Sequence, residues 1–210
     1  MPERKEPDDA AERISGWHYS LGWGDGTESV APYVPTPMNV VHEMLKLAKA
    51  GPGDVLYDLG CGDGRIILAA AEEFHVDHAV GFEINPQMAE ATRMKIYDRE
   101  LQGRVTVLQG DFFQEDLSEA TVVTLYLTTM GNSRLRPKLE RELRPGSRVV
   151  SHDFPITGWA HSREEERAYM MGSHKIFLYR VPEAYAAAKK ASDGDRWSRV
   201  RRLIERRGSA

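Results

Sequence analysis

The chain has 210 residues, which suits one folded domain with short appendages, and it carries a formal net charge of −4 with a pI near 6.0. This acidic balance gives no global attraction to nucleic acid or to an anionic membrane. The single cysteine, Cys61, excludes an internal disulfide, and no apolar run is long enough to span a bilayer. We therefore expect a soluble, cytoplasmic protein without membrane partners.

The first 36 residues are predicted to form a flexible tail followed by a lid. Residues 1–13 are highly charged and lack the apolar groups that would offset the entropy of ordering. Residues 14–36 mix aromatic residues with glycines without a clear period, which suits either a lid over a ligand or an arm packed for stability. A helix is predicted from Thr36 to Gly51, with Thr36 as its N-cap and Pro37 as its first residue.

Strands and helices alternate after residue 54. The predicted strands are 55–59, 78–82, 105–109, 121–127 and 148–153, and the helices between them are 65–74, 85–101 and 135–143. Residues 167–171 and 175–181 flank a Gly-Ser turn and predict an antiparallel hairpin. Continuous apolar strands separated by helices form parallel sheets. The predicted fold class is α/β, with a Rossmann-like, seven-stranded, mostly parallel sheet, a C-terminal antiparallel hairpin, and helices on both faces.

The most informative motif joins the first strand to its helix. Asp58 ends an apolar run, and Gly60, Gly62 and Gly64 then alternate with other residues. Glycines let the backbone turn tightly and approach a ligand without interference from a Cβ, and the helix N-terminus that follows presents free N–H groups. This pattern resembles the strand-to-helix signature of class I methyltransferases, which implies S-adenosylmethionine as the cofactor.

Two other interpretations of the motif are weaker. In a dinucleotide fingerprint the third glycine would fall at Arg65, and the Asp58 carboxylate would repel a pyrophosphate. The same carboxylate suits the ammonium group of the sulfonium cofactor's amino-acid tail. A glycine-rich turn without a ligand is disfavoured because three spaced glycines weaken an element.

Two more acids follow the next two strands. Glu83 ends the second strand and can accept both ribose hydroxyls of a nucleoside, while Asp111 follows the third and would accept from the adenine amino group, with Phe112 against the ring. Taken alone, Glu83 is better explained as a cap of the helix at Asn85-Pro86, and Asp111 as a cap of a turn. Together with Asp58 they mark one crevice at the carboxyl ends of three strands, where open α/β sheets bind ligands.

Several segments of the chain resemble a known family. They are PYVPTP at 32–37, YDLGCGDGRI at 57–66, GFEINP at 81–86, LQGDFF at 108–113 and LRPKLERELRPGSRVVSHDFPITGW at 135–159. Over roughly residues 32–160 the chain resembles the protein-lysine methyltransferases that include the archaeal broad-specificity enzyme and the mitochondrial enzymes acting on ATP synthase subunit c and the adenine nucleotide translocase. The resemblance implies that Tyr33, Pro35 and Thr36 close over the cofactor's methionine end. The chain lacks the membrane-embedded N-terminal segment of the mitochondrial members, so we do not expect their membrane substrates.

The resemblance implies in-line methyl transfer to a lysine amine. A lysine must first lose a proton, at a cost of about 4–5 kcal/mol at pH 7, and a dry, aromatic-lined channel lowers that cost. Tyr126, Asp153 and Trp159 follow strands four and five and are predicted to line this channel. His152 and Asp153 form a second candidate pair, in which one residue acts as general base for an oxygen nucleophile, while a hydrogen-bonded histidine beside the sheet is the simpler interpretation of His152. The two side chains are expected to face apart because neighbours on a strand point to opposite faces. No histidine pair has the spacing of metal ligands, so no metal is predicted.

Other functions remain open. One is a small-molecule O- or N-methyltransferase that uses residues 14–36 as a substrate lid. Another is a non-catalytic or nucleic-acid-directed module that uses the Arg-rich helix predicted within residues 183–210, although a solvated amphipathic face is the simpler interpretation of those arginines. The expected domains are residues 1–36, a cofactor-binding domain at 37–182, and the C-terminal helix at 183–210.

Overall fold

The computed structural model describes residues 30–160 and 170–186 of the chain. Its strands are β1 (Val55–Leu59), β2 (His78–Glu83), β3 (Val105–Gln109), β4 (Val122–Leu125), β5 (Arg148–His152), β6 (Met170–Met171) and β7 (His174–Arg180). Its helices are α2 (Met38–Leu47), α3 (Arg65–Glu72), α4 (Pro86–Asp98) and α5 (Thr129–Glu142). The predicted hairpin residues 167–169, the aromatic residues before 30 and the Arg-rich tail after 186 lie outside the described residues.

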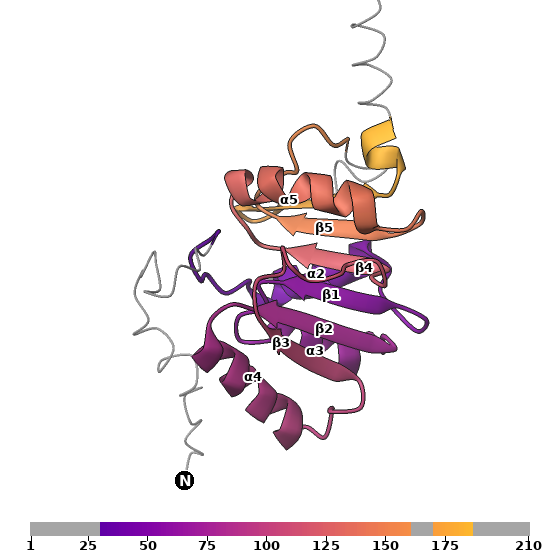
Figure 1. The fold of residues 1–210 in the computed structure, drawn as a ribbon. Coiled ribbons are helices and arrows are strands. Elements are labelled where there is room, and N and C mark those ends of the chain that lie inside the picture. Colours follow the sequence, from indigo (N-terminus) through magenta and orange to yellow (C-terminus); the bar gives the residue numbers. More distant parts are fainter. Residues whose placement is uncertain (1–29, 161–169, 187–210) are drawn as a thin grey trace, which may run out of the picture.

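One sheet organises the described part of the chain, in the order β3-β2-β1-β4-β5-β7-β6 (Figure 1). Strands β1 to β5 pair in parallel, β7 pairs antiparallel with β5, and the two-residue β6 pairs antiparallel with β7. The predicted α/β class and the mostly parallel sheet with a C-terminal antiparallel pair are therefore confirmed. The described sheet amounts to six strands of four or more residues, extended by β6 at one edge.

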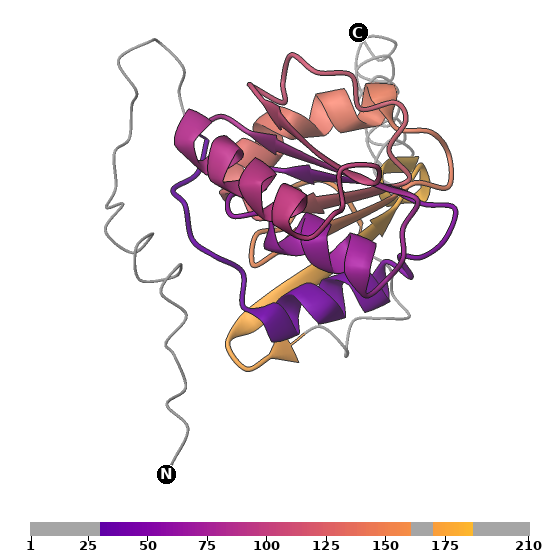
Figure 2. The same ribbon diagram turned by 90° about the horizontal axis from the view of Figure 1, so that it is seen from below.

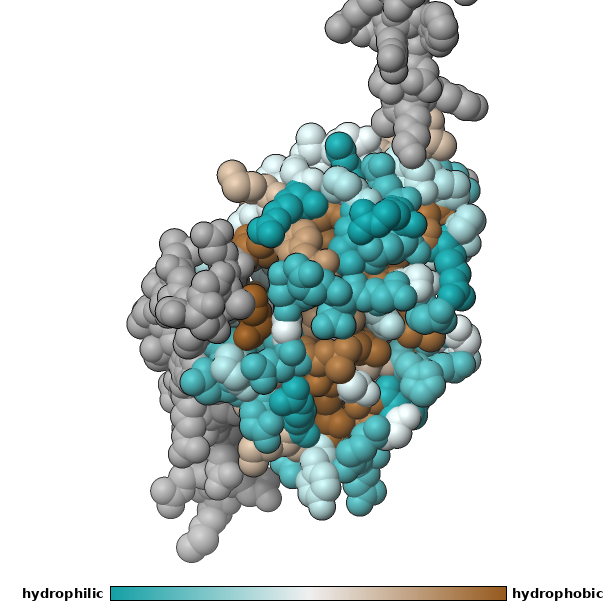
Figure 3. Space-filling view, in the orientation of Figure 1, coloured by the Kyte–Doolittle hydropathy of each residue, from teal (hydrophilic) through white to brown (hydrophobic). Residues whose placement is uncertain are grey.

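Helices cover both faces of the sheet. In Figure 2 the sheet lies between α5 on one side and α2 and α3 on the other. Two groups of buried apolar side chains fill these layers: α2, α3 and α4 contribute to the first, and α5 contributes to the second. The surface in Figure 3 is mostly hydrophilic, with apolar side chains gathered over the lower half of the sheet. Among the described residues, no helix combines the length and the apolar composition that crossing a bilayer requires.

Two helices begin elsewhere than predicted. Helix α2 begins at Met38 after Pro37, and its N-terminus has no side-chain cap, so Thr36 is not the predicted N-cap. The Thr36 hydroxyl instead lies 3.2 Å from Nδ1 of His152. Helix α5 begins six residues before the predicted start, because the Thr128 hydroxyl accepts a hydrogen bond from the Gly131 amide and caps it. The helix thus begins at its cap despite the poor helix propensity of the sequence after Thr128.

Candidate active site

The glycine motif forms a tight turn between β1 and α3. The amides of Gly60 and Cys61 both donate to the carbonyl oxygen of Phe82, at 2.9 Å each, and tie the turn to β2. The φ angles of Gly60, Gly62 and Gly64 are 92°, 54° and 82°. This left-handed region costs little only for glycine, because other residues bring their Cβ against the backbone. The three spaced glycines are therefore required by the path of the chain.

Glu83 lies at the end of β2 and reaches the same turn. Its side chain is nearly buried, since the residue is 8% exposed. Oε2 accepts from the Gly62 amide at 2.8 Å, and Oε1 accepts from the Asn85 amide at 2.9 Å. A carboxylate oxygen has two lone pairs, so each oxygen keeps one with which to accept a ribose hydroxyl. This buried carboxylate, oriented by two backbone amides, fits the ribose of S-adenosylmethionine. Glu83 is not the cap of α4, because the Asn85 side chain fills that role.

Asp58 lies on β1 at 3% exposure and accepts a hydrogen bond of 2.7 Å from the Thr124 hydroxyl. Burial raises the pKa of Asp58, the Thr124 hydrogen bond opposes this rise, and the nearby Glu83 and Asp63 add to it, so that the pKa lies at about 7. Burial likewise raises the pKa of Glu83, although its backbone hydrogen bonds oppose the shift. A cationic ligand bound beside this pair would favour the ionised carboxylates.

The affinity for S-adenosylmethionine is therefore expected to rise with pH. Below pH 7 the Asp58 carboxyl is protonated and must lose its proton before it can attract the cationic ligand, so binding releases a proton. The affinity therefore falls by up to about tenfold for each unit by which the pH is lowered. Above the pKa this dependence disappears. Titration calorimetry in two buffers of different ionisation enthalpy measures the released proton directly. Asp58→Asn should abolish that release, and equal affinity on both sides of pH 7 in the unmodified protein would contradict the assignment.

Asp111 and Phe112 follow β3, and the Gly110 amide ties this end of β3 to the Glu83 carbonyl oxygen at 3.0 Å. Oδ1 of Asp111 accepts from the Phe113 amide at 2.9 Å and thereby caps a turn. The Phe112 ring is largely buried, with its centroid 4.8 Å from that of Phe113. Both residues thus lie beside Glu83 as expected, and their contacts to adenine remain a prediction.

The segment before α2 lies beside the glycine turn. A Cβ added at Gly62 would come within 2.6 Å of the Tyr33 ring. Arg65 pairs with Asp63 at 2.7 Å and donates to the Thr36 carbonyl oxygen at 2.8 Å, so α3 holds this segment in place. Burial, together with Asp63, raises the pKa of Tyr33 to about 12, so its hydroxyl stays protonated. Pro35 is exposed on the same segment. The position suits the predicted closure over the cofactor, and that role remains a prediction.

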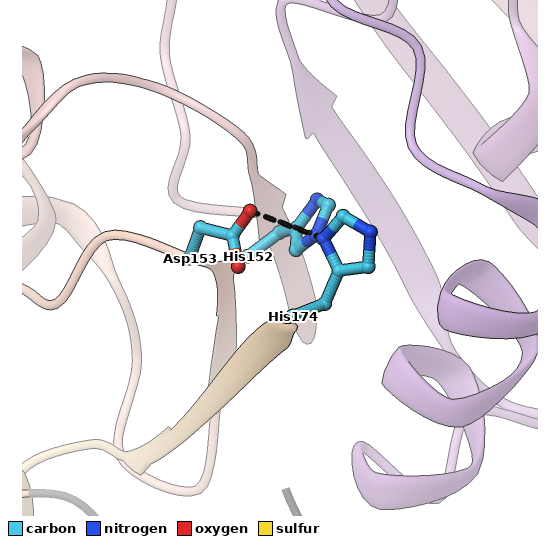
Figure 4. A group of neighbouring side chains, drawn as sticks. All are labelled: His152, Asp153 and His174. Carbon is cyan, nitrogen blue, oxygen red and sulfur yellow. Dashed lines mark hydrogen bonds and ion pairs between the residues drawn. The ribbon is translucent and has the colours of Figure 1, made fainter. Parts of the chain in front are cut away.

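His152 and Asp153 meet at the end of β5, contrary to the expectation that they face apart. The strand ends at His152, and Asp153 has a φ of 57°, so the chain turns back and the alternation of a strand no longer applies. Oδ2 of Asp153 lies 3.3 Å from Nε2 of His152 and 3.2 Å from Nδ1 of His174. Figure 4 shows the Asp153 carboxylate directed toward the two imidazole rings. The Tyr126 hydroxyl donates to the same Oδ2 at 3.3 Å, and its ring centroid is 3.9 Å from that of His152.

The protonation states within this group follow from its surroundings. His152 is fully buried, and burial lowers its pKa to about 4, partly opposed by Asp153. Burial raises the pKa of Asp153, but hydrogen bonds from the Lys175 amide and from His174 outweigh it, and the pKa lies below its usual value. At neutral pH His152 is thus neutral and Asp153 ionised. Both ring nitrogens of His152 contact protein groups, which matches the alternative of a buried, hydrogen-bonded histidine.

Two residues of this region, His174 and Asn132, were not identified from the sequence, and a third, Trp159, was predicted in the wrong surroundings. His174 begins β7 and reaches His152 because β7 pairs with β5. Asn132 is buried on α5, and its amide donates to the Phe154 carbonyl oxygen at 2.8 Å, which holds the loop after β5. Trp159 does not line the predicted channel, because its ring packs on Tyr179 at 5.5 Å and its indole N–H donates to Glu140. Asn132 lies before the helix predicted at 135–143 and its burial cannot be seen in the sequence, so the sequence carries no signal for this contact.

Comparisons with known proteins agree with this geometry. A family model described as the ANTKMT methyltransferase domain matches residues 58–163. A protein-lysine N-methyltransferase of Saccharolobus islandicus is 48% identical over 152 residues, covering 72% of this chain and 94% of the relative. The adenine nucleotide translocase lysine N-methyltransferase of Mus musculus is 34% identical, over 61% of this chain and 55% of the relative.

A solved structure extends the likeness to the fold. It is described as an RNA methyltransferase from Salinibacter ruber in complex with S-adenosyl-L-homocysteine. It is 43% identical to this chain with a TM-score of 0.67, covering 71% of this chain and 95% of its own. The glycine turn, the buried acids at the strand ends and these matches lead to one conclusion. The chain belongs to the ANTKMT methyltransferase domain family and is a methyltransferase that uses S-adenosylmethionine.

Proposed function

We propose that the methyl acceptor is a lysine side chain of a protein. The observation that carries this proposal is an aromatic surface at the carboxyl ends of β4 and β5, on the same edge of the sheet as the glycine turn. The rings of Tyr126 and Phe154 stack with their centroids 6.3 Å apart, and Phe154 is partly exposed. Such a surface suits the apolar stem of a lysine. The 48% identity to a relative named as a protein-lysine N-methyltransferase supports the same acceptor.

The proposed chemistry needs orientation and the removal of water more than acid–base groups. S-adenosylmethionine supplies an activated methyl group on a sulfonium. Glu83 and the glycine turn hold the nucleoside, while Tyr126 and Phe154 align the amine for in-line attack. Aromatic walls and the exclusion of water disfavour the ammonium form, so they lower the pKa of the entering lysine. Asp153 accepts the hydrogen of the Tyr126 hydroxyl and thereby fixes the ring.

Removal of the Tyr126 ring is expected to impair the acceptor and spare the cofactor. Tyr126→Ala should lower kcat/KM for a lysine-containing protein substrate by about 10–100-fold, because the amine loses its alignment and its dry wall. Affinity for S-adenosylhomocysteine should stay within about twofold, since the Tyr126 ring touches no residue of the glycine turn in the described contacts. Tyr97→Ala, on the exposed face of α4, is the matched aromatic control. A parallel loss of cofactor affinity would contradict this division of roles.

RNA is the second candidate acceptor, favoured by one observation. The Salinibacter ruber protein at 43% identity is described as an RNA methyltransferase. The chain has a net charge of −4, which gives it no overall attraction to the phosphates of RNA and therefore favours the protein acceptor.

One incubation separates the candidates. The purified protein, labelled S-adenosylmethionine and a cell lysate are divided after reaction into protein, RNA and small molecules. We expect label in protein, recovered as methylated lysine after acid hydrolysis. A Glu83→Gln variant supplies the background, because it is expected to bind the cofactor poorly. Label confined to RNA or to metabolites would overturn the lysine proposal and leave the methyltransferase assignment intact.

A further inference from the structure

Three ligand-type atoms form a small triangle at the ends of β5 and β7. They are Nε2 of His152, Nδ1 of His174 and Oδ2 of Asp153. The two nitrogens are 3.0 Å apart, and they lie 3.3 Å and 3.2 Å from the carboxylate oxygen. Figure 4 shows the three side chains converging from the two strands. The cofactor site does not use this triangle, and the proposed lysine chemistry uses it only through Asp153, which accepts the hydrogen of the Tyr126 hydroxyl.

The edges of the triangle match those of a metal coordination sphere. An ion about 2.0–2.1 Å from each atom sees neighbouring ligands about 2.9 Å apart in octahedral geometry and about 3.3 Å apart in tetrahedral geometry. The observed edges of 3.0, 3.2 and 3.3 Å fall within this range. Two imidazoles and one carboxylate form a ligand set that suits divalent first-row transition metals.

Hydrogen bonds alone do not account for all three edges. Each ring nitrogen presents either one hydrogen or one lone pair, and the Asp153 carboxylate presents only lone pairs. If both nitrogens donate to Oδ2, the two N–H groups face each other across the edge between His152 and His174. If one nitrogen accepts from the other, its lone pair faces the carboxylate oxygen. A cation in the middle removes this conflict, because all three atoms then direct lone pairs at it.

The surrounding contacts orient these ligands as outer partners do in metal sites. The Thr36 hydroxyl lies 3.2 Å from Nδ1 of His152, so it can accept an Nδ1–H and leave Nε2 free of hydrogen. The Lys175 amide donates to Oδ1 of Asp153 at 2.8 Å and fixes the carboxylate plane. Asp153 also has the left-handed φ of 57° that aims it at His152. Such strain clusters at functional sites.

One side of the triangle is open to solvent. His152 is fully buried, whereas the side chains of Asp153 and His174 are 24% and 31% exposed. A bound ion would therefore have three protein ligands and room for water or another small ligand, as in metal sites that are not closed by the protein. It would also join the end of β5 to the start of β7.

We propose that His152, Asp153 and His174 form a binding site for one divalent transition-metal ion of the Zn²⁺ type. The proposal is independent of the methyl acceptor, because it concerns binding alone. The ion would hold together the strand ends that carry Asp153, and through Asp153 the hydroxyl of Tyr126.

Metal binding to the untagged full-length chain tests the proposal. The protein is stripped with a chelator and titrated with Zn²⁺ against a chromogenic competitor, and Co²⁺ reports the coordination by its visible absorption. We expect one equivalent bound with a Kd of about 1 μM or lower, and intense Co²⁺ bands typical of four or five ligands. A rise in melting temperature with saturating Zn²⁺ should accompany binding.

Variants separate this site from other histidines. His174→Gln and Asp153→Asn should each weaken Zn²⁺ binding by about 100-fold and remove the Co²⁺ bands. His78→Gln, an exposed position on β2, should change neither. His174 is partly exposed at the start of β7, so its replacement is expected to leave the melting temperature of the metal-free protein nearly unchanged. Binding that survives in both ligand variants, or no binding at about 100 μM Zn²⁺, would overturn the proposal and leave the lysine proposal untouched.

Discussion

Replacement of Glu83 by alanine or glutamine is expected to weaken binding of S-adenosylhomocysteine by about 100-fold or more. Alanine removes acceptors for two ribose hydroxyls, and hydrogen bonds to a charged group contribute about 1.5–3 kcal/mol each. Glutamine keeps the shape but turns an NH₂ group toward a backbone amide, because Gly62 and Asn85 donate to the two carboxylate oxygens. Titration calorimetry provides the affinities.

A matched control and a fold check make this prediction specific. Glu90→Gln changes an exposed carboxylate on the neighbouring α4, and it should bind like the unmodified protein. The far-UV circular dichroism of each ligand-free variant should match that of the unmodified chain. Undiminished affinity in a folded Glu83→Ala protein would mean that the ribose binds elsewhere.

Gly64→Ala is expected to lower the free energy of unfolding by about 3 kcal/mol. Gly64 has a φ of 82°, where a Cβ costs about 1–2 kcal/mol. The added methyl would also overlap the Thr92 side chain. Thr92 is held there because its hydroxyl donates to the Gly62 carbonyl oxygen at 2.9 Å, so relief of the overlap breaks a buried hydrogen bond. Overpacking of this kind typically costs about 1–3 kcal/mol.

Urea denaturation measures this loss, and Gly103→Ala is its control. A Cβ at Gly103 would meet no atom within 4 Å, and its φ lies outside the left-handed region. We expect its unfolding midpoint to stay within the error of the unmodified protein. Equal midpoints for the two alanine variants would show that the turn at Gly64 relaxes without cost.

The glycine turn and the positions of the acids beside it were predictable because their signals are local. Each position of a left-handed turn favours glycine. The carboxyl ends of parallel strands lie at one edge of the sheet, so acids that are distant in the sequence come close together there. Asp58 and Glu83 were placed by these two rules. The same rules also placed Asp111, although the turn-capping alternative for it is realised in the structure as well.

The region around the ends of β4, β5 and β7 was less predictable because its contacts depend on irregular backbone and on long-range pairing. The rule that separates His152 from Asp153 holds only while a strand continues, and β5 ends between them. His174 is aligned with them by the register of β7 on β5, which no short motif specifies. The sequence around Thr36 predicts a helix cap, whereas its hydroxyl contacts the ring of His152, 116 residues away in the sequence.

Thr36 also contacts both halves of the site. Its carbonyl oxygen is held by Arg65 beside the glycine turn, and its hydroxyl contacts His152 behind Tyr126. If a ligand displaces one of these neighbours and thereby changes the free energy of the other, the effect is reciprocal by thermodynamic necessity. A single threonine of the connecting segment therefore contacts both the side of the site that carries the glycine turn and the side that carries Tyr126.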